Sequence, residues 1–245
     1  MATAQEEDQH GNSSSEIKIK VCKDGPYSVS GKVTIASQTI SCDEKGTPHQ
    51  WIEGEKYPLR ESCSLCRCGQ SGHKPFCDGM HIKVKFDGTE SANRLPYMEQ
   101  AKKIDGPRLE MHDAEALCAS ARFCHRGGEI WQLVSETDDQ ETRKTVIDDA
   151  GDCPSGRLVL RDKKTDKIIE PQFEKSIGLV EDPSIGASGP IWVRGGIPIE
   201  SADGKAYETR NRVTLCRCGK SGNKPFCDSS HYPEDLQEVK ADEQS

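Results

Sequence analysis

Residues 65–81 read LCRCGQSGHKPFCDGMH, and residues 215–231 read LCRCGKSGNKPFCDSSH. The two segments are identical at thirteen of seventeen positions and lie 150 residues apart. Four of the identical positions follow the spacing C-x-C-x8-C-x3-H, and cysteine and histidine are soft or borderline metal ligands. A pattern this specific, present twice, predicts two metal sites of the same kind in one chain.

Local chemistry explains how such a segment can gather its ligands. Gly69 and Gly72 give the backbone the freedom to bend after the C-x-C pair. Asp78 can cap free N–H groups of a helical turn that begins near Cys77, and His81, four residues after Cys77, then lies on the same face. The first site is therefore expected to combine a bent loop with one helical turn.

The repeated segment resembles the CDGSH iron–sulfur family of the mitoNEET type, whose pattern is C-x-C, a Ser/Thr-Gly loop and Pro-x-Cys-Asp-Gly-Ser-His. Met80 and Ser229 depart from this pattern, where the family has Ser and Gly. The resemblance implies one [2Fe–2S] cluster per motif. Its implied ligands are Cys66, Cys68, Cys77 and His81 in the first motif and Cys216, Cys218, Cys227 and His231 in the second.

Two other metal centres deserve comparison. Three cysteines and one histidine also suit zinc, so the spacing alone leaves a zinc site open. A Rieske centre needs two histidines on one iron, and each motif supplies one.

The second copy also separates candidate ligands from other cysteines and histidines. Some cysteines and histidines have no counterpart in the other copy or no partner at a ligand spacing, and we interpret them as residues that do not bind the metal. They are Cys22, Cys42, Cys63 and His73.

A second repeat lies upstream of the motifs. Residues 25–35 align with residues 189–199, and apolar side chains alternate in both around a central glycine, Gly31 or Gly195. Period two with a central glycine predicts a half-buried strand that is bent there. Copy one carries 14 extra residues between Ile35 and the motif. A short strand is also expected at residues 17–21, where Ile and Val alternate with Lys.

The segment between the repeats has a different pattern. We expect a helix over residues 114–124, capped by Asp113, and a strand over residues 130–134. In a continuous helix Cys118 and Cys124 would point apart, so the helix must end or unwind before Cys124 if both are ligands. A polar helix at residues 140–149 and a strand at residues 157–160 should follow.

Cysteines in this middle segment point to a third site. Cys118 and Cys124 form C-x5-C, and Cys153 directly precedes a proline, as the last cluster cysteine of ferredoxins commonly does. The combination resembles the divergent 4Fe–4S mono-cluster domain and implies a [4Fe–4S] or [3Fe–4S] cluster on these three cysteines. A fourth ligand remains open between His112, His125, Asp113, solvent and none. The alternative is a fold with buried, inert thiols.

The whole chain has 245 residues, of which 33% are hydrophobic and 5% aromatic, which favours small metal-stapled units over one large core. We predict an α+β fold in which two strand-rich CDGSH units share a β-cap as a pseudo-dimer, with a small ferredoxin-like segment between them. The expected divisions are a disordered tail (1–16), the first CDGSH unit (17–95), the central segment (105–180), the second CDGSH unit (185–236) and a polar tail (237–245).

The charge and composition of the chain limit the classes of partner and of function that we expect. A net charge of −8 disfavours nucleic acid as a partner, and no long apolar run predicts a membrane span. Without a visible signal peptide, a cytoplasmic, monomeric iron–sulfur protein is expected. We expect that the protein is not an enzyme. We expect an electron carrier, or a sensor that responds to redox state and pH, which works with redox partner proteins. The alternatives are a donor of clusters to apo iron–sulfur proteins and an accessory redox subunit of an oxidoreductase.

Overall fold

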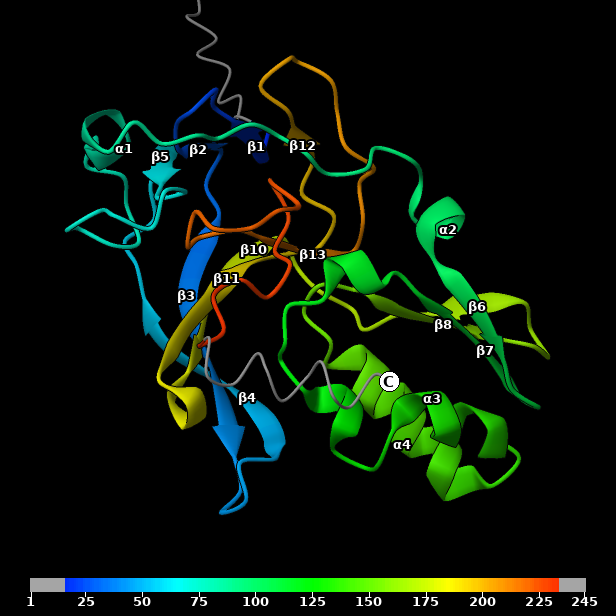
Figure 1. Cartoon of the computed structure of the whole chain (residues 1–245). Coiled ribbons are helices and arrows are strands. Elements are labelled where there is room, and N and C mark those ends of the chain that lie inside the picture. Colours follow the sequence, from blue (N-terminus) through cyan, green and yellow to red (C-terminus); the bar gives the residue numbers. More distant parts are fainter. Residues whose placement is uncertain (1–15, 234–245) are drawn as a thin grey trace, which may run out of the picture.

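The computed structural model describes residues 16–233, which form three β-sheets and a few short helices (Figure 1). The predicted tails at residues 1–16 (apart from Glu16) and 237–245 lie outside the described residues. The α+β class is confirmed, with strands dominating. The described residues include no helix long and apolar enough to cross a bilayer.

The first sheet belongs mainly to the first repeat. Ile19 and Val21 are fully buried on one face of its strand while Lys18 and Lys20 point outward, which confirms the predicted alternation. The order of the strands is β12 (Ile199–Glu200), β1 (Lys18–Val21), β2 (Tyr27–Ser30) and β5 (Ser62–Leu65).

The second sheet has five strands and combines strands of both repeats with β10, which directly precedes the second repeat. Trp192 and Val193, which lie next to each other on β11, are both buried, so this strand is covered on both faces. The order of the strands is β13 (Arg212–Leu215), β11 (Ala187–Arg194), β10 (Ser176–Asp182), β3 (Thr34–Cys42) and β4 (Pro48–Lys56).

The two repeats exchange one strand each. Gly31 (φ 80°) turns the chain out of the first sheet, and β3 then pairs in parallel with β10, with Ile35 opposite Ile177. Gly195 (φ 75°) does the same in copy two, so that β12 pairs in parallel with β1. Positive φ explains why glycine stands at both bends. The predicted pseudo-dimer with a shared cap is thus built by reciprocal strand exchange.

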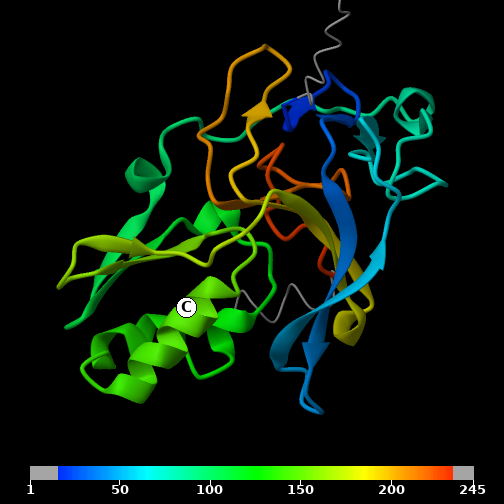
Figure 2. The same cartoon turned by 180° about the vertical axis from the view of Figure 1, so that it is seen from behind.

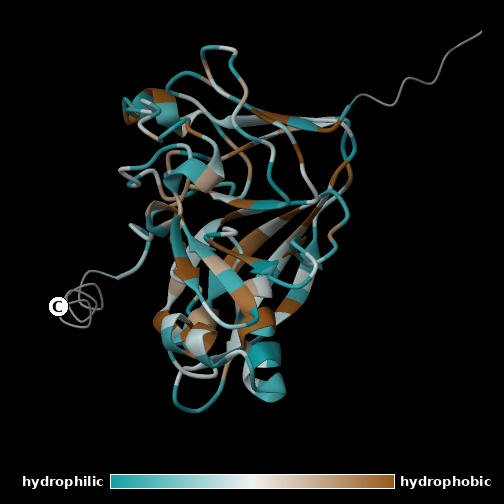
Figure 3. Ribbon diagram, turned by 90° about the vertical axis from the view of Figure 1, so that its right-hand side faces the viewer, coloured by the Kyte–Doolittle hydropathy of each residue, from teal (hydrophilic) through white to brown (hydrophobic). Residues whose placement is uncertain are grey.

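One hydrophobic core joins both repeats. It includes fully buried side chains from each, such as Ile19, Leu65, Ile177 and Leu215. Figure 3 shows apolar residues gathered along the strands, with polar residues along the loops and turns. Because the core spans both sheets, neither repeat can bury its apolar face alone.

A third sheet carries the central segment. Its order is β6 (Lys102–Asp105), β7 (Leu109–Asp113), β8 (Leu158–Asp162) and β9 (Lys167–Ile169). Helix α4 (Gln140–Gly151) confirms the predicted polar helix and is capped by Asp139, whose side chain accepts from the Thr142 amide at 2.8 Å. The remaining helices are α1 (Met80–Lys83), α2 (Tyr97–Gln100), α3 (Ile130–Leu133) and the 3-10 turns η1 (Glu115–Leu117), η2 (Phe123–His125), η3 (Val134–Glu136) and η4 (Pro183–Ile185).

Two predicted elements in this segment are wrong. The expected helix over residues 114–124 is broken into η1 and η2, because Ser120 (φ 53°) and Arg122 (φ 64°) adopt left-handed backbone conformations. Asp113 ends β7 and binds Arg157 rather than capping a helix. The expected strand at 130–134 is a helical turn instead, since Ile130 and Val134, both fully buried, lie on one helical face.

The extra residues of copy one form the β3–β4 hairpin. Its outer strand reaches across to the central segment, where the ring of Trp51 lies 5.1 Å from that of Phe123 and 4.8 Å from that of Trp192. The Trp51 indole N–H donates to the carbonyl of Asp152 at 3.1 Å. The insertion therefore ties the second sheet to the central segment.

Candidate metal centres

In the first motif the predicted ligands meet in two pairs. The sulfurs of Cys66 and Cys68 lie 3.9 Å apart at the end of β5. The sulfur of Cys77 lies 3.3 Å from Nδ1 of His81, which stands on α1. The Asp78 carboxylate accepts from the amide of Gly72 at 2.8 Å, which closes the loop between the cysteines. It also accepts from the amide of Met80 at 3.0 Å, at the start of the helical turn.

The second motif repeats this geometry. The sulfurs of Cys216 and Cys218 lie 3.7 Å apart after β13, and that of Cys227 lies 3.5 Å from Nδ1 of His231. Asp228 accepts from the Gly222 amide at 2.7 Å, as Asp78 does in the first motif. The same chain spacing therefore folds in the same way twice.

These pair distances fit tetrahedral metal ions. Two thiolates on one ion, with bonds of about 2.3 Å, stand roughly 3.8 Å apart, and a thiolate and an imidazole stand roughly 3.5 Å apart. Each pair can thus occupy one edge of one tetrahedral ion, and each motif offers two such edges. Among residues 16–233, no three side chains of His, Cys, Asp or Glu gather closely enough for a single metal ion.

A buried arginine holds each C-x-C loop. The Arg67 guanidinium donates to the carbonyl of Gly88 at 2.7 Å, and that of Arg217 donates to the carbonyls of Gly189 (2.8 Å) and Val180 (2.7 Å). Both arginines are nearly inaccessible to solvent.

The two motifs touch back to back across the pseudo-twofold axis. A Cβ on Gly69 would stand 2.4 Å from the carbonyl oxygen of Cys218, and a Cβ on Gly219 would stand 2.6 Å from that of Cys68. Both glycines also have positive φ. Only glycine permits this approach, which brings the two C-x-C loops into main-chain contact.

The two motifs differ in how they are covered. Cys77 is half-buried and Asp78 exposed in the first motif, whereas Cys227 is buried in the second. The second motif, in red, lies between the first motif and the central segment in both Figure 1 and Figure 2. Its loop is held from the central side by Asn223, whose amide donates to the carbonyl of Ala116 at 2.8 Å.

The central cysteines influence one another electrostatically. Burial first, and then the neighbouring thiols of Cys153 and Cys118, raise the pKa of Cys124. Burial alone would lower the pKa of Arg157, but hydrogen bonds and charge from Asp113 and Cys118 outweigh it and raise that pKa. The half-buried Arg157 cation therefore interacts with both Asp113 and Cys118.

Each side chain considered for a fourth ligand has other partners. His112 lies 2.7 Å from the Glu110 carboxylate, and His125 lies 2.8 Å from that of Glu129. Asp113 accepts from Arg157 at 2.6 and 2.8 Å. The hydroxyl of Ser155, which the sequence did not single out, lies 3.5 Å from the sulfur of Cys153.

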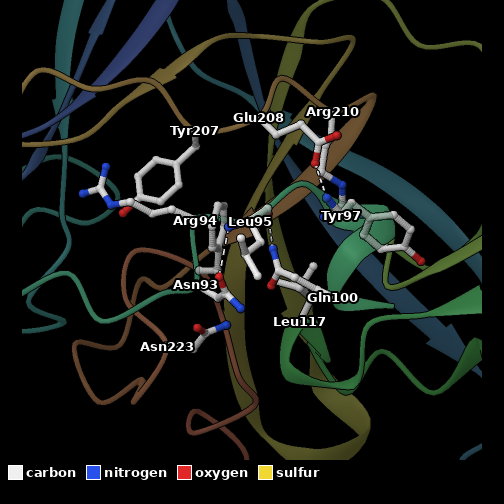
Figure 4. Close-up of a pocket in the computed structure, with 11 residues that line it drawn as sticks. Asn93, Arg94, Leu95, Tyr97, Gln100, Leu117, Tyr207, Glu208, Arg210 and Asn223 are labelled. Atoms are coloured by element: carbon white, nitrogen blue, oxygen red, sulfur yellow. Dashed lines mark hydrogen bonds between the residues drawn. The ribbon is translucent and has the colours of Figure 1, made fainter. Parts of the chain in front are cut away.

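A small pocket lies beside the second motif (Figure 4). Polar side chains dominate its rim, and Glu208 there accepts from the amide of Tyr97 at 2.6 Å. The lining within the described residues contains no cysteine. The residues around it are Asn93, Arg94, Leu95, Tyr97, Gln100, Leu117, Tyr207, Glu208, Arg210, Asn223 and Phe226.

Sequence reasoning missed three supporting residues. Arg67 and Arg217 occupy the same place in both copies, so the comparison of the repeats already contained that signal. Tyr27 donates its hydroxyl to the carbonyls of Cys216 (2.8 Å) and Pro225 (3.0 Å) in the other motif. The repeat gave no signal for it, because its counterpart is Ile191.

Family models match three regions of the chain. The model described as iron-binding zinc finger, CDGSH type, matches residues 24–82 and 188–232. The model of the divergent 4Fe–4S mono-cluster matches residues 104–163. Comparison with curated proteins and with solved structures finds no significant match. The chain is therefore an iron–sulfur cluster-binding protein in which two CDGSH domains flank a divergent 4Fe–4S mono-cluster domain.

Proposed function

We propose that the chain is a one-electron carrier with two [2Fe–2S] clusters and a third cluster, [4Fe–4S] or [3Fe–4S], on the central cysteines. The observation that carries the proposal is the pairing of ligands: each motif presents one Cys–Cys pair and one Cys–His pair at distances suited to one ion each. Two ions per motif correspond to a two-iron cluster. A carrier, rather than an enzyme, is our proposal for the chain itself.

Histidine ligation adds a response to pH. A proton and an iron ion compete for the same imidazole nitrogen of His81 or His231, so acid should loosen the cluster. An added electron makes the imidazole more basic and favours proton uptake. We therefore propose that the carrier couples electron uptake to protonation, which also suits a sensor of redox state and pH.

The test begins with anaerobic purification, an absorption spectrum and counts of iron, sulfide and zinc. If each chain holds more iron than two [2Fe–2S] clusters contain, the central site is also occupied. Colourless protein that holds zinc contradicts the proposal. Reversible redox titration without loss of iron supports the carrier. The variants His81→Cys and His231→Cys should lower the potential of one site each and slow its bleaching in acid. If they bleach as fast as the parent, histidine is not the labile ligand.

The first motif also supports a second candidate, donation of a cluster to an apo iron–sulfur protein. Cys77 and His81 are only half-buried, and α1 has no fully buried residue. Transfer of colour from the protein to an apo-ferredoxin, with loss from the first motif before the second, would favour the donor over the carrier. Redox proteins or apo iron–sulfur proteins are the partners we propose, in a cytoplasmic setting where thiolates stay reduced.

A further inference from the structure

Ser229 stands where the first motif has glycine. Gly79 has a φ of 85°, and Ser229 keeps almost the same left-handed conformation, with a φ of 76°. This region disfavours residues that carry a Cβ. The second motif therefore retains a strained serine at a position where glycine would fit without strain. We expect its hydroxyl to make a contact that offsets this strain.

The hydroxyl of Ser229 contacts the central site. It donates to the carbonyl of Cys118 at 2.8 Å and accepts from the hydroxyl of Ser120 at 2.7 Å. Ser120 is itself buried and left-handed, with a φ of 53°. Two strained serines from different domains thus meet beside a predicted ligand of the central cluster.

The main chain of Ser229 belongs to the second CDGSH motif. Ser229 follows Cys227 by two residues, and its backbone lowers the pKa of the Cys227 thiol against the larger effect of burial, which raises it. One residue therefore joins the sulfur of Cys227 to the backbone of Cys118. The path consists of the covalent bonds from Cys227 to Ser229 and the hydrogen bond from the Ser229 hydroxyl to the carbonyl of Cys118, the kind of connection that supports electron tunnelling.

The first motif has no such bridge in the part of the chain that the structure describes. A Cβ on Gly79 would meet no atom within 4 Å. The first motif instead contacts the second through Gly69 and Gly219. Figures 1 and 2 show the same order, with the second motif between the central segment and the first motif.

We propose that Ser229 is a positioning residue that couples the central cluster to the second CDGSH cluster, so that electrons pass in the order central site, second motif, first motif. The inference rests on the proposed function. One electron leaves the site of Cys118, Cys124 and Cys153, which is oxidised, and enters the site of Cys227, which is reduced. No covalent bond forms or breaks. The electron enters from a one-electron donor of the flavoprotein or ferredoxin class.

The test compares Ser229→Gly with the matched variant Gly79→Ser in the whole protein. Ser229→Gly removes the hydroxyl and relieves the strain, so it should fold and keep its iron, sulfide and absorption spectrum. Electron paramagnetic resonance of the dithionite-reduced protein should show weaker spin–spin coupling between the central and second clusters. Hydrogen exchange of the amides of residues 118–122 should rise roughly two- to tenfold, the effect of losing one hydrogen bond. Gly79→Ser should leave both signals unchanged.

Ser120→Ala provides a second route to the same outcome, since it removes the other half of the serine pair without altering either CDGSH motif. It should raise exchange at residues 118–122 in the same range. Unchanged coupling and exchange in Ser229→Gly, with iron intact, overturn the bridge but leave the proposed function standing. Parent protein that holds zinc in place of iron overturns the proposed function itself, and the bridge with it.

Discussion

The hydroxyl of Tyr27 lies 2.8 Å from the carbonyl oxygen of Cys216, so a side chain of the first repeat holds the ligand loop of the second. Tyr27 is fully buried, and its hydroxyl also donates to Pro225. Burial, and then the nearby thiol of Cys216, raise the pKa of Tyr27 well above its usual value. The phenol therefore stays a neutral hydrogen-bond donor across the physiological range.

Tyr27→Phe should leave two buried carbonyls without this donor and lower the free energy of unfolding by about 1–3 kcal/mol. The second site should release iron faster than the first, because the lost contacts belong to its loop. Denaturant unfolding and site-resolved electron paramagnetic resonance measure the two effects. Equal loss from both motifs would show that Tyr27 supports only the shared core.

Gly69→Ala should disturb both motifs at once. A left-handed alanine costs about 1–2 kcal/mol by itself, and the new Cβ would collide with the Cys218 carbonyl at 2.4 Å. We expect a total loss above about 2 kcal/mol. Gly72→Ala is the matched control, since its Cβ would stand 3.6 Å from Asp78, in ordinary contact. Similar stability of the two variants would contradict the back-to-back packing.

The sequence predicted the features that repeat. Comparison of two copies identified the candidate ligands, the glycine bends and the 14 extra residues, because two copies under one folding constraint keep what the fold requires. The shared cap of a pseudo-dimer was expected from the family resemblance, but the strands that exchange were not. Which strand enters which sheet depends on partners more than 100 residues away, as in the pairing of Ile19 with Ile199, and local patterns carry no such information.

The central segment was harder to predict because it has no second copy. Residues 114–124 are rich in helix-forming alanine, yet the left-handed backbone of Ser120 and Arg122 breaks the segment into two 3-10 turns. Over residues 130–134 an apolar pattern of five residues fits either a strand or one helical turn. The helical turn forms instead of a strand because it places Ile130 and Val134 on one face, where both are buried against the rest of the fold.

Acid should weaken the central sheet through Glu110. A hydrogen bond from Lys103, and a further one from His112, hold the pKa of this carboxyl below its usual value of 4.5. A depressed carboxyl pKa in the folded state stabilises the protein above the ordinary pKa, and this stabilisation is lost as the pH falls through the lowered value. Glu110→Gln should therefore lower Tm at pH 7, and the gap from the parent should close below about pH 4.

Thermal unfolding followed by circular dichroism at several pH values measures that gap. Glu115→Gln is the control, since its ion pair with Lys102 is long (3.8 Å) and exposed, so its Tm should follow the parent at every pH. A gap between Glu110→Gln and the parent that persists unchanged below pH 4 would mean that shape, rather than charge, makes Glu110 important.

The β3–β4 hairpin should protect the central cluster. Trp51 packs on Phe123, which precedes Cys124, and donates to the carbonyl of Asp152, which precedes Cys153. Trp51→Ala removes both contacts at once. Since the side chain is only half-buried, we expect a loss of about 2–4 kcal/mol, slightly below the usual cost of removing a core aromatic ring.

The consequence should be local, because the hairpin reaches the central segment but supplies no ligand to either CDGSH motif. In Trp51→Ala the central site should lose its iron first on exposure to air or chelator, while both CDGSH signals persist. Ile52→Ala is the matched control, because Ile52 follows on the same strand and is 46% exposed. Its central site should behave like the parent's. Simultaneous loss of all three signals in Trp51→Ala would instead assign the hairpin to the stability of the whole fold.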